Sequence, residues 1–168
     1  MLSEKSSARI EGSVLDFSRR RSRTHYQTRF LLTLTFSFME ADQLNKLSKE
    51  IIGAAVEVHR YFGPGLLENT YRDALVLELG LRNIEARKEV VVPCLYKGFK
   101  LDLGFRADVV VRDSIVVELK ATQEDNPVFA KQLFTYLKVM DKRLGLLINF
   151  NKSRLIDGVT RVVNRFQE

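Results

Sequence analysis

Residues 106–120 read Arg-Ala-Asp-Val-Val-Val-Arg-Asp-Ser-Ile-Val-Val-Glu-Leu-Lys. Two β-branched runs flank a short polar segment, residues 112–114, and this pattern predicts two antiparallel strands joined by a hairpin loop. If the loop contains these three residues, Asp108 on the first strand faces Glu118 on the second. A two-residue loop would place the two carboxylates on opposite faces of the hairpin.

Under the three-residue loop, side chains alternate between two faces of the hairpin. The apolar face is directed into the core and contains Val109, Val111, Ile115, Val117 and Leu119. Asp108, Glu118 and Lys120 share the other face. Two carboxylates held side by side repel each other, so they usually require a cation or a proton. A divalent metal would meet this need, and Lys120 could then hold an attacking water or the phosphoryl oxygens of a phosphodiester.

The same charged residues admit a structural interpretation. An ordinary amphipathic hairpin also exposes a solvated charged face, and the spacing of Asp108, Glu118 and Lys120 does not by itself separate that case from a metal site. The metal interpretation therefore depends on the surrounding motifs.

Cysteine and histidine are scarce in the chain, which contains only Cys94, His25 and His59. This inventory excludes an internal disulfide and a zinc cage made of Cys and His. Any metal must therefore be held by carboxylates, and such a site favours Mg²⁺ or Mn²⁺. We expect Cys94 to pack as a small apolar side chain and His59 to have a structural or supporting role.

The 168 residues, 45% hydrophobic and 29% charged, predict one globular domain, which we assign to residues 39–168. The net charge of +6 is unevenly distributed. Residues 1–38 carry seven basic and three acidic side chains, so the remaining residues carry 20 and 18 and are nearly neutral. A nearly neutral domain lacks the overall excess of positive charge that attracts phosphate groups, so nucleic acid would have to bind at a local patch.

Residues 1–38 form a basic segment that ends in an apolar run over residues 30–38. The run is too short to span a bilayer. In outline the segment is similar to a secretory signal, but no small-residue cleavage site follows it. We expect a disordered extension or an over-extended start, with Met39 as the true first residue, and hence a cytoplasmic protein without a membrane partner.

Hydrophobic periodicity predicts both helices and strands in residues 39–168. Helices are expected at residues 44–62, 66–79 and 127–140. Gly80 is the expected left-handed C-cap of the second helix, and Asn126 and Pro127 are expected to begin the third. Strands are expected at residues 89–96, 99–103, 105–111, 115–119, 144–150 and 157–163, the first four as a meander and the last at an edge. This α/β order, with its strands and helices partly segregated as in α+β proteins, predicts a mixed β-sheet core flanked by helices.

Several short motifs occur in the order found in one protein family. Residues 65–71, Gly-Leu-Leu-Glu-Asn-Thr-Tyr, match the signature of the GxxExxY proteins, a group within the PD-(D/E)XK nuclease superfamily. The resemblance extends over about residues 47–163 and includes residues 58–60, 63–65, 96–98, 106–108, 117–120, 132–137 and 145–150. It implies a restriction-endonuclease-like fold and a metal-dependent phosphodiesterase, with Asp108 and Glu118 as metal ligands and Lys120 as the catalytic lysine.

The resemblance also gives roles to two residues of the second expected helix. Glu68 would be the additional acid that such nucleases present from an early helix, both as a metal ligand and in catalysis. Tyr71 lies three residues further along the same face, so it could contact substrate in the same cleft. Glu68 could instead only complement the positive end of its helix, and Tyr71 could pack in the core with its hydroxyl at the rim.

Gln132 and Tyr136 are four residues apart on the third expected helix, so they share a face. In related nucleases such a pair borders the active site. Gln132 could hydrogen-bond a phosphate or a metal-bound water, and Tyr136 could stack on a base or sugar. The face could equally be explained by packing on the sheet.

Three functions remain open at this point. The first is a nuclease that uses Mg²⁺ or Mn²⁺ to hydrolyse nucleic acid, with DNA as the expected substrate. The second is a non-catalytic binding or interaction module that retains the fold. The third is a nuclease that works only as a homodimer or with a protein partner.

Overall fold

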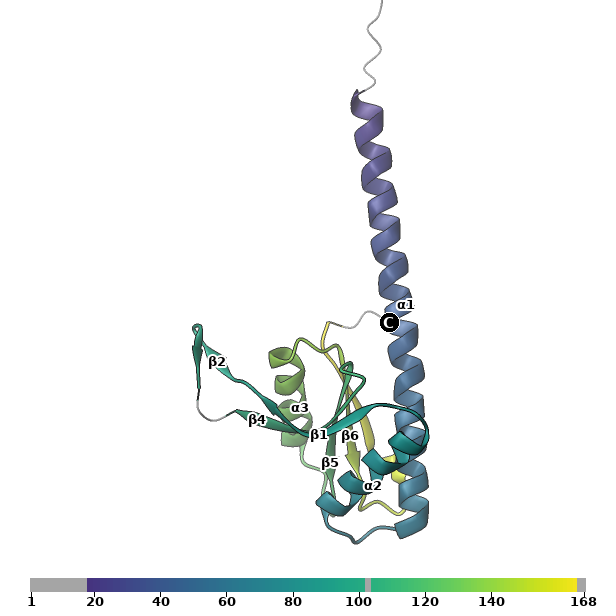
Figure 1. The fold of residues 1–168 in the computed structure, drawn as a ribbon, viewed down its shortest axis with the longest axis vertical. Coiled ribbons are helices and arrows are strands. Elements are labelled where there is room, and N and C mark those ends of the chain that lie inside the picture. Colours follow the sequence, from purple (N-terminus) through teal and green to yellow (C-terminus); the bar gives the residue numbers. More distant parts are fainter. Residues whose placement is uncertain (1–17, 102–103, 166–168) are drawn as a thin grey trace, which may run out of the picture. The chain divides into compact units, whose positions relative to one another are not determined.

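The computed structural model describes residues 18–101 and 104–165, with side chains described from residue 40 onward except at Lys100. The chain divides into two compact units, Met1–Phe38 and Met39–Glu168. The elements follow in the order α1 (Ser18–Phe62), α2 (Glu68–Leu81), β1 (Ala86–Val92), β2 (Leu95–Tyr96), β3 (Phe99–Lys100), β4 (Phe105–Val111), β5 (Ile115–Lys120), α3 (Pro127–Val139), β6 (Leu144–Asn149), the 3-10 turn η1 (Leu155–Gly158) and β7 (Val159–Val163) (Figure 1).

The main sheet has five strands in the order β1-β4-β5-β6-β7. Strands β5 and β6 run parallel, and the other neighbouring pairs run antiparallel. A parallel pair requires a crossover connection, which is α3 in this chain. The predicted mixed α/β sheet flanked by helices is therefore confirmed.

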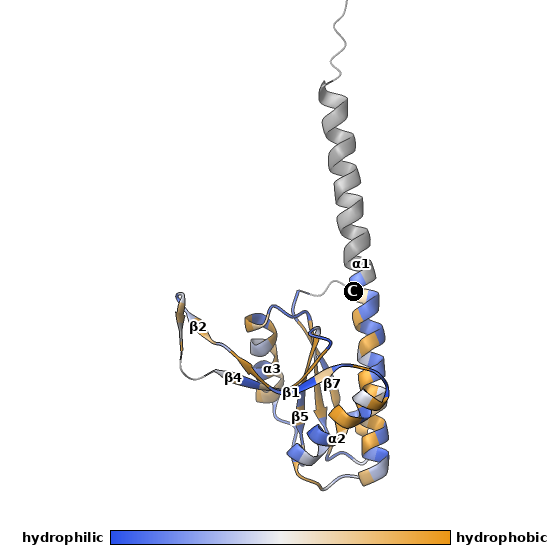
Figure 2. Ribbon diagram, viewed as in Figure 1, coloured by the Kyte–Doolittle hydropathy of each residue, from blue (hydrophilic) through white to orange (hydrophobic). Residues whose placement is uncertain are grey.

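Helices cover both faces of the sheet, and the central strands carry mostly hydrophobic residues (Figure 2). On the face opposite α1 and α2, Leu133 and Leu137 of α3 pack against the sheet. Apolar side chains of α1 and α2 pack against the other face, among them Ile51, Ala55, Leu75 and Leu79. Because both faces are buried, β5 and β6 are apolar nearly throughout.

The β4–β5 hairpin has the register that a three-residue loop predicts. Val109 pairs with Val117 and Val111 pairs with Ile115. The loop closes through a hydrogen bond of 2.9 Å from the Ser114 N–H to the Val111 carbonyl. Val109, Val111, Ile115, Val117 and Leu119 all belong to the cluster packed by α1 and α2, as expected.

The predicted four-stranded meander is wrong. Strand β1 pairs with β4, whereas β2 and β3 form a separate two-stranded sheet. Pro93 follows β1 directly, and a proline has no N–H to continue the ladder. Lys97 and Gly98 then close the β2–β3 turn with φ of 50° and 85°. Residues 102 and 103 of the expected second strand lie outside the described residues.

One of the two predicted helix caps differs in the structure. Gly80 lies inside α2, whose C-cap is Arg82, and Asn83 takes the left-handed conformation with a φ of 58°. Asparagine tolerates this conformation better than most residues. The start of α3 is as predicted, because Pro127 is its first residue and the Asn126 side chain accepts a hydrogen bond from the Val128 N–H.

Helix α1 begins at Ser18, well upstream of the apolar periodicity that starts at residue 44. The expectation of a disordered or over-extended start concerns residues 1–38, of which residues 1–17 lie outside the described residues. The backbone of residues 18–38 is helical. Across the residues that are described, none of the helices combines the length and the apolar character needed to cross a membrane.

Candidate active site

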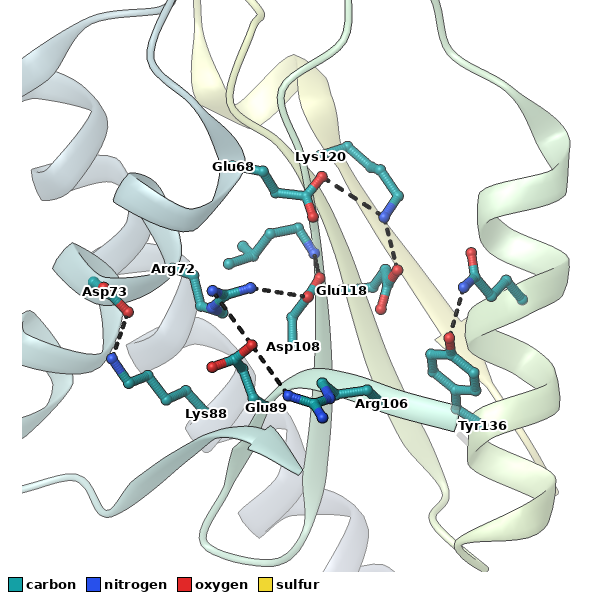
Figure 3. Close-up of polar contacts among 12 residues, drawn as sticks. Glu68, Arg72, Asp73, Lys88, Glu89, Arg106, Asp108, Glu118, Lys120 and Tyr136 are labelled. Atoms are coloured by element: carbon teal, nitrogen blue, oxygen red, sulfur yellow. Dashed lines mark hydrogen bonds and ion pairs between the residues drawn. The ribbon is translucent and has the colours of Figure 1, made fainter. Parts of the chain in front are cut away.

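Four of the predicted site residues meet beside the sheet (Figure 3). Asp108 lies on β4, while Glu118 and Lys120 lie at the end of β5. Glu68 is the first residue of α2. The alternation of side chains along the hairpin, together with the position at which α2 begins, brings three carboxyl groups and one ammonium group together.

The ammonium group of Lys120 contacts two of the three carboxyl groups, those of Glu118 and Glu68. Lys120 Nζ donates a hydrogen bond of 2.7 Å to Glu118 Oε1 and lies 3.8 Å from Glu68 Oε2. It also lies 5.2 Å from the centroid of the Phe129 ring on α3. Burial lowers the pKa of Lys120, but the Glu118 hydrogen bond and the neighbouring carboxylates outweigh it and hold the pKa above its ordinary value. Lys120 is therefore a charged ammonium at neutral pH.

Glu118 is only 3% exposed. Burial, followed by repulsion from Asp108, raises the pKa of its carboxyl from 4.5 to about 7, although Lys120 opposes the shift. Within the described part of the chain, the buried side-chain nitrogen or oxygen atoms that lack a hydrogen-bond partner are Glu118 Oε2 and Arg72 Nε. A buried polar atom without a partner is costly, so this carboxylate has an unmet need for a cation or donor.

Asp108 is held from two sides. Its Oδ2 accepts a hydrogen bond of 2.8 Å from the Leu119 N–H across the hairpin. Its Oδ1 lies 3.7 Å from Arg72 Nη1, and Arg72 Nη2 lies 3.7 Å from Glu89 Oε1. The carboxylate of Asp108 is thereby fixed next to Glu118, with Arg72 supplying partial compensation for its charge.

Glu68 contacts the cluster through Lys120. Over residues 18–101 and 104–165, no group of three or more His, Cys, Asp or Glu side chains is arranged to hold a metal ion. Glu68 Oε2 faces Lys120, and the pKa of Glu68 is raised by burial despite the lowering effect of Lys120. That Glu68, Asp108 and Glu118 share one ion therefore stays a prediction. Asp108 and Glu118 lie next to each other on the adjacent strands β4 and β5 (Figure 3).

Gln132 and Tyr136 share a face of α3, as predicted. Gln132 Nε2 donates a hydrogen bond of 2.6 Å to the Tyr136 hydroxyl, and the Tyr136 ring lies against Phe105 with centroids 5.3 Å apart. Burial raises the pKa of Tyr136 above its ordinary value. Tyr136 is only 3% exposed, so little of its ring is free for the stacking on a base that was expected, and its hydroxyl is held by Gln132.

Tyr71 is fully buried and stacks on Phe150, with ring centroids 4.4 Å apart. Its hydroxyl donates to the Gly63 carbonyl at 2.6 Å and accepts from the Leu66 N–H at 3.0 Å. The packing interpretation thus describes its position better than the substrate-binding one. Tyr71 fixes the turn that precedes Glu68.

His59 also has a structural position. It is buried, and its Nε2 lies 2.8 Å from the Lys152 carbonyl oxygen. The contact ties the end of α1 to the loop after β6. It does not bring His59 into contact with the carboxylates, in agreement with the structural role expected for it.

Two residues near the site were not predicted from the sequence. Arg72 follows Glu68 by four residues on α2, and this helical spacing was the available signal. Glu89 lies on β1 between Lys88, which pairs with Val109, and Val90, which pairs with Ala107. Its φ is 51°. A positive φ is uncommon for glutamate, so the sequence carried no signal for this distortion.

A pocket of about 240 Å³ opens beside Lys120, between α3 and the ends of β6 and β7. Phe129 and Asn149 are among the residues that line it. A larger pocket of about 740 Å³ lies at the β4–β5 turn, where Asp113 and Arg112 contribute to its wall. The chemistry of the residues, rather than the size of the hollow, distinguishes the smaller pocket as the one that adjoins the reactive groups.

Known proteins resemble this chain to different extents. One solved structure, described as "Crystal structure of SSO0001", shares 24% identity with the chain at a TM-score of 0.45. The alignment covers 59% of this chain and 50% of the other, so it spans only half the length of that protein. A search of the curated proteins gives no match. The family model for the PD-(D/E)XK nuclease superfamily matches residues 45–162, which include the whole charged cluster, and the chain therefore belongs to the PD-(D/E)XK nuclease superfamily.

Proposed function

We propose that this protein is a metal-dependent nuclease that hydrolyses phosphodiester bonds, with DNA as the expected substrate. The observation that carries the proposal is Glu118 Oε2, a buried carboxylate oxygen without a partner beside a second carboxylate, Asp108. In a protein that needed only a stable hairpin, an apolar residue in place of this carboxylate would increase stability. Membership of the nuclease superfamily supports phosphodiester hydrolysis as the reason why the chain has a carboxylate at this position. Residues 65–71 further support placing the chain among the GxxExxY proteins.

Asp108 and Glu118 would hold the metal ion. Mg²⁺ is usually bound by one or two carboxylates together with waters and substrate phosphates, so two ligands from this chain are sufficient. Mn²⁺ would suit the same oxygen ligands. When bound, the ion would neutralise charge on the scissile phosphate and acidify a water. Glu68 would act through its contact with Lys120.

Lys120 would contact the substrate directly. An ammonium group has three donors, and Glu118 uses one of them. The others are available for a phosphoryl oxygen or for the attacking water, with positive charge placed where negative charge develops. Glu68 and Phe129 keep the ammonium group in position from α2 and α3. Gln132, whose amide holds the Tyr136 hydroxyl, has a carbonyl oxygen that could accept a hydrogen bond from a water at the edge of the site.

A cleavage assay tests this function. Single- and double-stranded DNA and RNA would be incubated with the full chain and Mg²⁺ or Mn²⁺. We expect the wild type to cleave at least one of these substrates. The cleavage rate should fall about a hundredfold or more in Asp108→Ala and in Lys120→Ala, because each change removes a group proposed to stabilise the transition state. Asp42→Ala and Lys131→Ala are matched controls, since both residues are exposed and lie outside the cluster.

Cleavage that persists in both Asp108→Ala and Lys120→Ala would show that the activity arises elsewhere. The variants should first be shown to have the circular dichroism spectrum of the wild type, so that loss of activity is not loss of folding. Equal losses in the two control variants would also contradict the assignment.

A non-catalytic binding module is the second candidate, and one observation favours it. Lys120 and Arg72 already lie against Glu118 and Asp108, so the carboxylates have cationic neighbours within the chain itself. Calorimetric titration with Mn²⁺ separates the candidates. Binding that disappears in Asp108→Ala supports the metal site, whereas no binding together with no cleavage supports the module or a nuclease that needs a partner.

A further inference from the structure

A short two-stranded arm extends from the β1–β4 strand pair. We define the arm as residues 93–101, which contain β2, β3 and the turn between them (Figure 1). Tyr96 pairs with Phe99 across the turn. A hydrogen bond of 2.9 Å from the Leu101 N–H to the Cys94 carbonyl extends the hairpin toward its base.

Two aromatic rings stand on one face of the arm. Directly opposite residues of an antiparallel pair point to the same side, so Tyr96 and Phe99 share a face. Their side chains are 62% and 76% exposed, and Leu95 is exposed as well. An isolated two-stranded hairpin is marginally stable in water, and exposed apolar groups of this kind usually mark a contact surface.

The arm carries two basic side chains. Residues 93–101 contain Lys97 and Lys100 and no acidic residue, while Glu89 and Asp102 lie outside the arm on either side of it. Lys97 Nζ lies 5.5 Å from the centroid of the Tyr96 ring. The arm therefore combines ring faces with positive charge, and it supplies a local patch of the kind that the nearly neutral domain requires for nucleic acid.

The arm is connected directly to the charged cluster. It is inserted between β1 and β4, and Asp108 lies on β4 only three residues beyond Phe105, the first residue of the strand. Three residues of a strand span roughly 10 Å. Nucleic acid bound to the arm would thus be held by an insertion in the same strand pair that carries Asp108.

We propose that the arm binds unpaired nucleotides, with bases stacking on Tyr96 and Phe99 and Lys97 contacting the backbone phosphates. Stacking on aromatic rings needs bases that are free of a duplex, and it tolerates any sequence. A second copy of the chain fits less well, because two arms that both carry lysines and lack acids would repel each other. This inference rests on the proposed nuclease function for its biological purpose, but it can be tested without cleavage.

Fluorescence anisotropy of labelled oligonucleotides in the presence of EDTA provides the test. The probes are a thymidine homopolymer, a uridine homopolymer and a mixed-sequence duplex, each of about 20 nucleotides, which exceeds the usual site size of one binding fold. The full chain is compared with Tyr96→Ser/Phe99→Ser. We expect the double variant to bind the single strands at least roughly tenfold more weakly, with a smaller effect on the duplex. The two homopolymers show whether the arm prefers DNA or RNA.

A matched control is available on α2. Leu77 and Leu81 are 66% and 71% exposed, close to the values for the two aromatic residues of the arm, so Leu77→Ser/Leu81→Ser removes a similar amount of exposed apolar surface. We expect this control to bind as the wild type does. In addition, Lys97→Gln should reduce the slope of log affinity against log salt by about one unit, because one phosphate contact is lost.

A tryptophan introduced in the arm gives an independent readout. The chain contains no tryptophan, so Phe99→Trp places the chain's single tryptophan in the arm, where it can be excited selectively over the tyrosines. Quenching of its emission by the thymidine homopolymer is expected from base stacking. Leu77→Trp, at the control position, should not be quenched.

The outcomes are distinguishable. Binding to single strands that is absent, or that is unchanged in the double variant, overturns the proposal. A wild type that sediments as a dimer and a double variant that sediments as a monomer, with equal oligonucleotide binding, would assign the arm to self-association instead. Arm-dependent binding without any cleavage in Mg²⁺ or Mn²⁺ would support nucleotide binding by the arm and contradict the nuclease function. Cleavage with an unchanged KM in the double variant would support the nuclease function and contradict binding by the arm.

Discussion

At the scale of one residue, the buried carboxyl of Glu118 lowers the stability of the folded protein while serving the proposed metal site. Its carboxyl is buried next to Asp108, and the pKa is raised from 4.5 to about 7. The folded protein therefore retains a proton over a pH range in which the unfolded chain has released it. Between pH 4.5 and about 7 the free energy of unfolding should fall as pH rises, because the unfolded state binds fewer protons.

Replacing this carboxyl by an amide should stabilise the protein. We expect Glu118→Gln to be more stable than the wild type at about pH 8 without divalent metal, by an amount on the order of 3 kcal/mol at most. Below pH 4.5 the difference should largely vanish, since the wild-type carboxyl is then protonated in both states. Urea denaturation across this pH range measures the effect. The exposed Glu124→Gln is the control, and a Glu118→Gln variant that is less stable at the alkaline end would contradict the account.

At the scale of single elements, α3 supplies both the crossover between the parallel strands and several groups around the site. Its first turn is stabilised by the Asn126 side chain, which accepts a hydrogen bond of 2.9 Å from the Val128 N–H. Phe129, which lies against Lys120, follows immediately. The start of the helix therefore affects the position of the proposed catalytic lysine.

Asn126→Ala should lower the free energy of unfolding by about 1 kcal/mol, the usual cost of losing an N-cap. Thermal and urea unfolding monitored by circular dichroism measure this loss. Asn126→Asp retains the side-chain oxygen and should restore most of the stability. A full loss in Asn126→Asp would show that the cap hydrogen bond is not the reason.

The elements also show where prediction from the sequence succeeds. The β4–β5 hairpin and the start of α3 follow from local patterns, because turn length and capping chemistry act over a few residues. The Gly80 cap and the meander are wrong, since α2 continues to Leu81 and the left-handed residue is Asn83, while β1 pairs with β4 and not with the strand that follows it. Arg72 joins the site through a contact with Asp108 on another element, and no local pattern specifies such a contact.

For the whole molecule, metal binding should be coupled to stability. An ion that binds the folded protein at a concentration about 100 times its Kd stabilises it by about 2.7 kcal/mol. We expect Mn²⁺ at about pH 8 to raise the Tm of the wild type by roughly 5–10 °C and to leave that of Asp108→Ala nearly unchanged. Differential scanning calorimetry at constant ionic strength checks this. An equal rise in both proteins would place the ion elsewhere.

The arm, a two-stranded sheet inserted between β1 and β4, is separate from the main sheet that carries the proposed reaction site. The pairing of β1 with β4 ends at Val92, directly before Pro93, and does not involve the arm. The three-residue loop after β4 sets the register that brings Asp108 next to Glu118. Exchanging the arm for a hairpin of another length alters loop-closure entropy only slightly, since that cost grows with the logarithm of loop length. Related proteins could therefore acquire new targets by changing this one insertion while the reaction centre stays intact, and engineered chimaeras could exploit the same freedom.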